Sequence, residues 1–407
     1  MCRRIWLLMS TISFVSFLIF VLVSSGLARD RENTLYVFPG GPRGEDPQAR
    51  LVADNEGNLY GATYYGGTYG WGTIFELKHS NKGWTQTIIY SFLGSNDGSN
   101  PTGNLLIDNA GNLYGTTEFG GTGSTCTGTP CNGTVFELTR SEGLWKHSVL
   151  YSFCSVSACS DGAGPSGLTF DQAGNLYGTT AGGGMGCQPD GCGTVYELTP
   201  SNGNWTETVL YYFDQNNGGG FFPAGEVALD SAGNVYGTTY VGGANNFGDV
   251  FKLMHTKGRW KELVLYNFTS GNGGANGGLI LGTTDVIFGT TDYGNGVGSV
   301  FELRHSRGRW HETILYAGNG PNSHLVLDKT GALYGTALLG GASGNGFAFR
   351  LQHKKYWRMD VLHSFAGGND GGNPAAGLIL AADGNLYGTT SLSNNSQYGG
   401  TVFQITP

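Results

Sequence analysis

Charged residues are scarce in this 407-residue chain, because only 13% of its residues are Asp, Glu, Lys or Arg and the formal net charge is −8. An acidic chain without a Lys/Arg cluster is a poor match for nucleic acid or for an anionic membrane surface. Proline is also scarce, and the 72 glycines follow no three-residue period, which excludes collagen. So much glycine excludes a helical bundle as well.

Recognisable catalytic motifs are missing too. The chain contains no GxSxG elbow, no HExxH, no Walker loop and no GxGxxG between a strand and a helix. The sequence therefore assigns no catalytic residue, no cofactor and no metal ligand. Hydrophobic residues nevertheless make up 39% of the chain and aromatics 13%, which argues against disorder and leaves a β-rich, turn-rich globular protein.

The N-terminus has the layout of an export signal. Arg3 and Arg4 precede an apolar run from Ile5 to Val23, and small residues follow up to Ala28. This predicts a signal peptide over residues 1–28. The run could also span a bilayer, so an uncleaved N-terminal anchor is the alternative. In both cases we expect residues 29–407 to be secreted or held in the cell envelope, with no other membrane contact.

Cysteine spacing points to local crosslinks. Cys2 lies in the signal, and the other six residues form three C-x4-C pairs: Cys126 with Cys131, Cys154 with Cys159, and Cys187 with Cys192. An even number of cysteines in an exported chain predicts disulfides, and the repeated spacing favours pairing within each motif. A zinc site is the alternative, although zinc usually prefers tighter cysteine spacing and nearby histidines.

A repeated unit of about fifty residues dominates the rest of the chain. The string GNLYG, exact or degenerate, recurs with its aromatic at Tyr60, Tyr114, Tyr177, Tyr236, Phe288, Tyr334 and Tyr387. Each unit holds an apolar run such as LLID, then NLYGTT, then TVFELT, and finally a Trp-led run ending in LYSF. Four short β-prone runs separated by turn residues predict one propeller blade, with burial falling from the innermost strand outward.

The ends of the chain predict that the ring closes on itself. The last unit stops after its third run, and the missing fourth run appears at Leu35 to Phe38, which read LYVF. An N-terminal strand that completes the last blade would remove an exposed sheet edge. We therefore predict that residues 29–407 form a single seven-bladed β-propeller of four-stranded antiparallel blades, and we expect a monomer.

The motif GNLYGTT, followed by GG, GTVFELT and a Trp-led LYSF strand, closely resembles the GloVer tandem repeat of exported bacterial proteins, the choice-of-anchor family. The resemblance covers nearly all of Leu35 to Pro407, and kelch blades are more distantly similar. It implies an exported β-propeller but carries no activity onto particular residues. Members often end in an anchoring segment, so the end at Pro407 implies release or N-terminal anchoring.

Most recurring polar residues have a structural interpretation. The Asp-x-x-Gly-Asn motif that starts at Asp54, Asp108, Asp171 and Asp230 predicts a capped hairpin rather than a calcium loop, since each turn offers one carboxylate. The Trp that opens each fourth run predicts packing between blades. Four histidines at one equivalent place, His79, His255, His305 and His353, predict solvated hairpin residues spread around the ring.

One face of the predicted ring is the better candidate for function. The connections from fourth to first and from second to third strands emerge together, vary in length and carry all three Cys pairs, and variable loops on a rigid scaffold commonly bind ligands. Asp97, Asp161 and Asp370 lie in fourth-to-first connections and are candidate ligand residues there, although each precedes Gly in a turn.

The favoured function is a non-catalytic exported propeller that binds a protein or a carbohydrate through this face. The alternative is a carbohydrate-active enzyme, a lyase or glycosidase, with acidic residues near the central channel. A glycosidase would need two carboxylates about 5 to 10 Å apart. A purely structural envelope or adhesion module, without a small-molecule pocket, is a third hypothesis.

Overall fold

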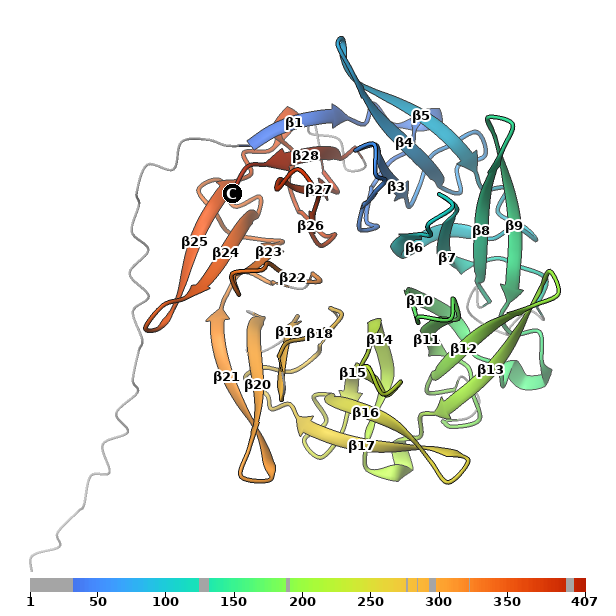
Figure 1. Ribbon diagram of the computed structural model, residues 1–407, viewed down its shortest axis with the longest axis vertical. Coiled ribbons are helices and arrows are strands. Elements are labelled where there is room, and N and C mark those ends of the chain that lie inside the picture. The colour runs from blue at the N-terminus through green and yellow to red at the C-terminus, as the bar shows by residue number, and fades with distance from the viewer. Residues whose placement is uncertain are drawn as a thin grey trace, which may run out of the picture.

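The computed structural model shows seven four-stranded antiparallel sheets arranged as a ring around a central axis (Figure 1). The structure describes residues 32–123, 132–187, 191–275, 277–283, 285–292, 298–321, 323–392 and 399–407. The predicted all-β, seven-bladed propeller is confirmed. The predicted signal peptide lies outside the described residues.

Strands are numbered along the chain, and in the first six blades they follow chain order within each blade. Blade 1 contains β2 (Val52–Ala53), β3 (Leu59–Thr63), β4 (Thr73–Ser80) and β5 (Gly83–Ser91), and blade 2 contains β6 (Ser99–Ile107), β7 (Leu113–Phe119), β8 (Thr134–Ser141) and β9 (Leu144–Ser152). Blade 3 contains β10 (Ala163–Phe170), β11 (Leu176–Gly182), β12 (Thr194–Ser201) and β13 (Asn204–Tyr212), and blade 4 contains β14 (Gly220–Leu229), β15 (Val235–Gly242), β16 (Asp249–Thr256) and β17 (Arg259–Asn267).

The remaining three blades repeat the pattern. Blade 5 contains β18 (Ile280–Leu281), β19 (Val286–Thr291), β20 (Ser299–Ser306) and β21 (Arg309–Ala317), and blade 6 contains β22 (Val326–Leu327), β23 (Leu333–Ala337), β24 (Phe347–His353) and β25 (Trp357–Ser364). Blade 7 contains β26 (Ile379–Leu380), β27 (Leu386–Thr390) and β28 (Thr401–Ile405).

The helices among the described residues are short 3₁₀ turns: η1 (Gly41–Arg43), η2 (Ser157–Cys159), η3 (Gln215–Asn217) and η4 (Gly368–Asp370). In this part of the chain, no helix has the length and apolar character needed to cross a membrane.

The N-terminal strand β1 (Glu32–Val37) completes blade 7. It pairs antiparallel with β28, from Glu32 opposite Ile405 to Val37 opposite Thr401, and Figure 1 shows the blue strand beside the red one. The backbone N–H of Phe38 then donates to the carbonyl of Gly400 at 2.9 Å. The predicted offset that closes the ring is therefore confirmed.

Aromatic pairs hold neighbouring blades together. At six of the seven seams, a Phe at the end of the fourth strand packs edge-on against a third-strand aromatic of the next blade, with ring centroids 4.8 to 5.3 Å apart. These pairs are Phe38–Phe75, Phe92–Phe136, Phe153–Tyr196, Phe213–Phe251, Phe268–Phe301 and Phe365–Phe403. At the seam between blades 5 and 6, Tyr316 contacts Phe347 and Phe349 instead.

The glycine of each GNLYG-type motif makes room for these rings. A Cβ atom added at this position would lie 2.4 to 2.7 Å from the third-strand aromatic of the same blade, closer than real Cβ contacts. The seven residues are Gly61, Gly115, Gly178, Gly237, Gly289, Gly335 and Gly388. These glycines are therefore required by space, whereas those of the tight turns, such as Gly57 with φ of 83°, are required by backbone conformation.

The prediction that burial falls steadily from the first strand outward is wrong. The second strand β3 is buried at every residue, whereas both residues of the first strand β2 are only half-buried. First strands face the axial channel, while second and third strands are covered on both sides by neighbouring blades. In four blades the regular part of the first strand is also only two residues long.

The recurring polar and aromatic residues act within this framework. Asp54 Oδ1 accepts from the backbone N–H groups of Glu56 and Asn58 at 2.9 Å, and Asp54 Oδ2 accepts from the Tyr60 hydroxyl at 3.0 Å. The Trp residues contact second-strand aromatics of the preceding blade, as in Tyr60–Trp145 at 6.0 Å between ring centroids. The four equivalent histidines lie 5.0 to 5.3 Å from the Trp of their own hairpins and do not converge.

Ring closure can be tested at Phe38. Its side chain is 2% exposed and packs against Phe75 of blade 1, while its own strand β1 belongs to blade 7, so the contact spans the seam where the ring closes. We expect Phe38→Ala to lower the free energy of unfolding by about 3–5 kcal/mol, which is typical of a buried Phe. Phe92→Ala, at the equivalent place inside the chain, is the matched control in urea unfolding. A loss for Phe92→Ala without one for Phe38→Ala would contradict closure by the N-terminal strand.

Candidate functional site

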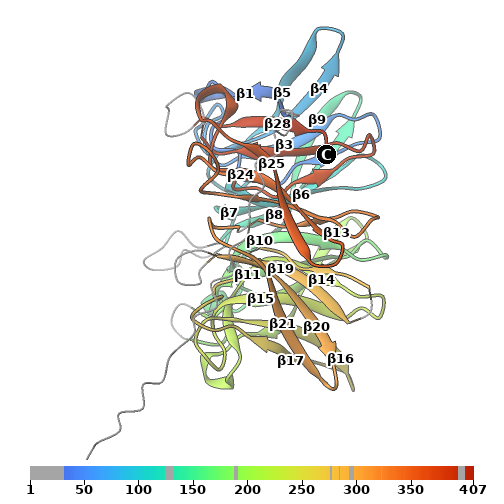
Figure 2. The ribbon, with the colours of Figure 1, turned by 90° about the vertical axis from the view of Figure 1, so that its left-hand side faces the viewer.

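Strand pairing gives the ring two different faces, which Figure 2 shows edge-on. Third and fourth strands are joined by tight turns, as between Ser80 and Gly83, which face one another in the register. These turns and those between first and second strands form the short-turn face. The fourth-to-first and second-to-third connections emerge on the opposite side, which we call the loop face.

Exposed aromatic side chains gather on the loop face. Among the described residues, six of the exposed large hydrophobic residues are aromatic, and five of them belong to loop-face segments: Tyr65, Tyr69, Trp71, Phe222 and Phe247. The sixth, Tyr356, lies in a third-to-fourth turn on the short-turn face. Exposed apolar groups concentrated on one side commonly mark a binding surface.

Three of these side chains come from a single connection in blade 1, between β3 and β4. Tyr69 is 56% exposed, Trp71 46% and Tyr65 39%. We call this set the aromatic platform. Trp71 lies outside the Trp series of the fourth strands, so the packing role of that series does not apply to it.

Backbone hydrogen bonds fix the platform from both sides. Tyr65 exchanges two bonds with Glu45, at 3.0 and 3.1 Å, and the carbonyl of Trp71 accepts from the N–H of Asn100 at 2.9 Å. The Trp71 ring also lies against Gly94, where an added Cβ would approach ring atoms to 2.4 Å. Blade 1 thus presents its exposed aromatics on a loop that both neighbouring fourth-to-first connections hold in place.

The three candidate aspartates lie at separate seams, and two of them are buried while Asp370 is half-buried. Asp97 is 9% exposed and Asp161 2%. Asp97 Oδ2 accepts from the N–H of Leu93 at 2.9 Å and from the Tyr90 hydroxyl at 2.8 Å, and Asp161 is bound in the same way by Ser155 and Tyr151. These contacts account for Asp97 and Asp161 as loop caps, and a ligand role for either stays a prediction.

Each candidate aspartate belongs to a recurring set that we call the seam triad. It consists of a fourth-strand Tyr (His363 in blade 6), an Asp or Asn in the following connection, and a residue on the fourth strand of the next blade. The Tyr211 hydroxyl donates to Glu262 Oε2 at 2.9 Å, and the Tyr266 hydroxyl donates to Glu312 Oε2 at 3.0 Å. The remaining oxygen of each glutamate is buried without a hydrogen-bond partner.

Burial changes the acidity of these seam glutamates. It raises the pKa of Glu207 to about 8, with the Asp161 carboxylate adding to the effect. It also raises the pKa values of Glu262 and Glu312 to about 7. A carboxyl group loses stabilising solvation when it is buried, so the neutral form is favoured. The seams are therefore sites where protonation and blade packing are coupled.

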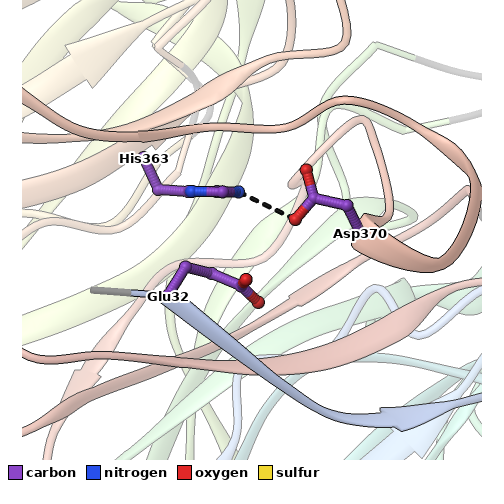
Figure 3. A group of neighbouring side chains, drawn as sticks. All are labelled: Glu32, His363 and Asp370. Carbon is purple, nitrogen blue, oxygen red and sulfur yellow. Dashed lines mark hydrogen bonds and ion pairs between the residues drawn. The ribbon is translucent and has the colours of Figure 1, made fainter. Parts of the chain in front are cut away.

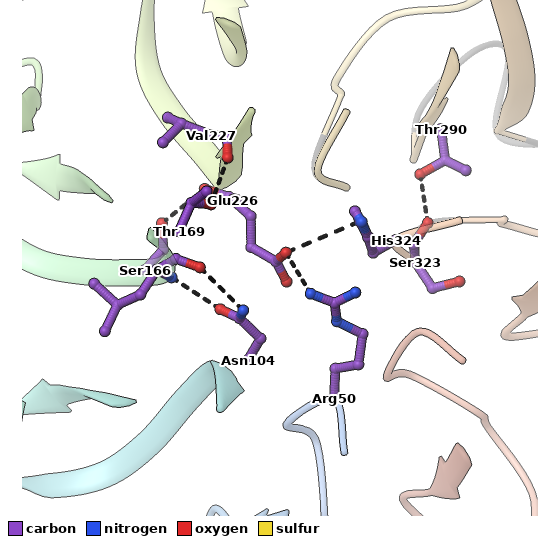
Figure 4. Close-up of polar contacts among 11 residues, drawn as sticks. Arg50, Asn104, Ser166, Thr169, Glu226, Val227, Thr290, Ser323 and His324 are labelled. Atoms are coloured by element: carbon purple, nitrogen blue, oxygen red, sulfur yellow. Dashed lines mark hydrogen bonds and ion pairs between the residues drawn. The ribbon is translucent and has the colours of Figure 1, made fainter. Parts of the chain in front are cut away.

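A polar cluster lies at one level of the central axis (Figure 4). The residue just before each buried first-strand aliphatic forms a ring of seven positions: Arg50, Asn104, Gly167, Glu226, Gly278, His324 and Gly377. Arg50 Nη2 contacts Glu226 Oε2 at 2.6 Å across the channel, and His324 Nδ1 lies 4.0 Å from the same oxygen. Asn104 exchanges two hydrogen bonds with the backbone of Leu168 in the next blade.

The three ring glycines leave space for these long side chains. A Cβ at Gly167 would lie 2.4 Å from Glu226 Cγ, and one at Gly377 would lie 2.7 Å from the His324 carbonyl oxygen. Burial holds the pKa of His324 well below its usual value, so its imidazole is neutral. Burial raises the pKa of Glu226, and Arg50 opposes that rise. Among its seven positions the cluster contains one carboxyl group rather than an acid pair.

Three recesses among the described residues lie on the short-turn face, between first-to-second turns of adjacent blades. The recess between blades 4 and 5 has a volume of about 660 Å³ and includes Asp230, Lys252 and Trp310. Similar recesses lie between blades 7 and 1 and between blades 3 and 4. Because they recur at equivalent seams, the repeat geometry explains them without a specific ligand.

Two disulfides rigidify the loop face within the described residues. Cys154 is bonded to Cys159 in the connection between blades 2 and 3, and Cys187 is bonded to Cys192 in the second-to-third connection of blade 3. Cys126 and Cys131 lie outside the described residues.

The sequence analysis did not identify the polar cluster at the axis or the aromatic platform. The polar cluster could have been found by comparing the residue that precedes each apolar first-strand run. This residue is Arg, Asn, Glu or His in four units and Gly in the other three. Trp71 could have been found as a Trp outside the fourth-strand series. A repeat pattern reveals residues that recur, whereas these residues differ from unit to unit.

This geometry defines the protein as a closed seven-bladed β-propeller with a polar cluster at its axis and an aromatic-rich loop face. Within that class, the chain belongs to the Gloeobacter/Verrucomicrobia repeat family, whose model matches residues 19–218 and 124–322. No curated protein sequence matches it.

Solved structures resemble the chain in fold. One is the extracellular domain of a protein described as a one-component system of B. thetaiotaomicron, with a TM-score of 0.55 and 12% identity, covering 91% of this chain and 39% of that one. Another is a protein described as a 6-phosphogluconolactonase from Bacteroides uniformis, with a TM-score of 0.53 and 13% identity, covering 84% of this chain and 95% of that one. The chain thus spans well under half of the first relative's length.

The seam glutamates predict a pH dependence of stability. A carboxyl group whose pKa is raised in the folded state contributes stability below its unfolded pKa, and this is lost as pH rises through the folded value. With the pKa of Glu207 at about 8 and those of Glu262 and Glu312 at about 7, stability should fall between pH 5 and about pH 8.5. Glu207→Gln should flatten this slope in urea unfolding across that range. An unchanged slope would show that Glu207 ionises normally in the folded protein.

Proposed function

We propose that the protein is an exported, non-catalytic propeller that binds a carbohydrate on its loop face. The observation that carries the proposal is the aromatic platform, where Tyr65, Tyr69 and Trp71 are exposed on a single loop with a fixed backbone. Flat apolar ring faces of sugars can stack on such aromatic surfaces, while the phenol and indole groups supply hydrogen bonds. Because the loop is already ordered, binding costs little conformational entropy.

The axial cluster supports a binding role over a hydrolytic one. A glycosidase needs a second carboxyl group that acts with the first. Of the seven ring positions, all within the described residues, only Glu226 is acidic, and its carboxylate is engaged by Arg50. These features favour a propeller that uses its rim rather than its channel.

The low charge of the chain also fits a neutral partner. Only 13% of its residues are charged. Tyr and Trp also dominate the energetics of many protein interfaces, so a protein partner is the competing interpretation of the same surface. The two are separated by whether isolated oligosaccharides bind.

The experiment is a glycan array followed by titration of the best ligand against wild-type protein and Trp71→Ala. We expect Trp71→Ala to weaken binding about tenfold or more, since a lost aromatic contact contributes about 0.5–1.5 kcal/mol in addition to buried area. Tyr356→Ala, an exposed aromatic on the short-turn face, is the matched control and should bind like wild type.

Silence on the array, together with a specific protein captured from the native envelope, would overturn the carbohydrate assignment. Equal losses for Trp71→Ala and Tyr356→Ala would overturn the assignment to the loop face. Turnover of the bound glycan by wild-type protein would overturn the non-catalytic assignment.

A further inference from the structure

The seam between blades 6 and 7 differs from every other seam in one chemical respect. Six fourth strands carry a Tyr at the same position, namely Tyr36, Tyr90, Tyr151, Tyr211, Tyr266 and Tyr316. The fourth strand of blade 6 carries His363 there. The seam triad at this place is therefore His363, Asp370 and Glu32, rather than a set built around a phenol.

The three side chains converge, although Glu32 and His363 are more than three hundred residues apart. One ligand atom from each lies within 4.8 Å of the others, and His363 Nε2 is 2.8 Å from Asp370 Oδ1. Figure 3 shows the Glu32 carboxylate directed from β1 toward the His363–Asp370 pair. His363 comes from β25 and Asp370 from η4, so three separate segments meet at this point.

The local environment suits a bound cation. The His363 side chain is 7% exposed and that of Asp370 is 22% exposed, so the imidazole is sheltered while one side of the cluster remains open to solvent. The Phe365 ring packs edge-on against His363 at 4.9 Å and fixes its orientation. The backbone N–H of Ala366 donates to Asp370 Oδ2, which holds that carboxylate in place and leaves Oδ1 facing the imidazole.

We propose that Glu32, His363 and Asp370 form a site for a divalent transition metal, with zinc as the metal of best fit. Zinc binds imidazole nitrogens and carboxylate oxygens in a tetrahedron, so this residue set supplies three ligands and water can complete the fourth position from the open side. Calcium and magnesium fit less well, because they prefer sites made of oxygen ligands. The site is independent of the carbohydrate surface on blade 1.

A metal here would join the N-terminal strand to blade 6. Glu32 is the first residue of β1, the strand that completes blade 7, while His363 lies on the outer strand of blade 6. The Thr34 hydroxyl, also on β1, already contacts the carbonyl of Asn369 next to Asp370 at 3.4 Å. The ion would therefore reinforce the closing end of the ring, and metal that binds only the folded state raises stability by mass action.

The test is thermal unfolding of the full chain with increasing zinc after metal removal, together with metal analysis of the zinc-loaded protein. Wild-type protein should bind one zinc per chain at this site and show a rise in Tm of ~2 °C or more at saturation. His363→Tyr restores the residue found at the other seams, so it should fold and lose both the bound zinc and the Tm response. His255→Tyr, at an exposed hairpin histidine, should keep both.

Glu32→Gln provides a second variant at the rim of the cluster, so that the test does not depend on one substitution. It should weaken zinc binding at least tenfold while leaving the metal-free Tm close to that of wild type. An unchanged wild-type Tm in zinc, or the same zinc response in wild type and His363→Tyr, would overturn the proposal. A larger response to calcium or magnesium than to zinc would overturn the assignment of the metal.

Discussion

Every blade depends on an aromatic ring lying over a glycine. In each unit the third-strand Phe or Tyr folds across the glycine of the second strand, where no Cβ could fit. At six seams this placement lets a fourth-strand Phe of the preceding blade pack edge-on against the same ring. The contact joins strands within one blade and also joins neighbouring blades. The position of a single glycine therefore determines the packing both inside each sheet and between the sheets.

This dependence explains how much of the fold could be predicted from the sequence. Glycine, the aromatics and the fourth-strand Phe recur because every seam needs them, and their repetition predicted seven blades and closure by residues near Leu35. The predicted decrease of burial from the first strand to the fourth was wrong, because an apolar run in the sequence does not show whether the strand faces the central channel. The first strands are apolar, yet in several blades they border the axis rather than a covering sheet.

The features that bear on function could not be predicted in the same way, because they are departures from the repeat. Arg50, Glu226 and His324 occupy equivalent places but differ chemically, and only the closed ring brings them together at the axis. His363 replaces a recurring Tyr, and Glu32 reaches it only because the N-terminal strand completes the last blade. Asp97 and Asp161 recur, and the structure explains them as caps. In this protein, repetition identifies the scaffold, and differences between repeats identify the candidate sites.

The most direct test of this account is a double-mutant cycle between Gly115 and Phe136 in blade 2, measured by urea unfolding. A Cβ at Gly115 would lie 2.6 Å from Phe136 Cζ. Gly115→Ala should strongly destabilise the wild-type protein, but in the Phe136→Ala background it should cost much less, because the ring that it strikes most closely is gone and only the approach to Leu105 Cδ2 at 2.8 Å remains. A coupling free energy above about 1 kcal/mol is the predicted result. Equal effects of Gly115→Ala in both backgrounds would contradict the claim that glycine is required because the aromatic ring occupies the space of a Cβ atom.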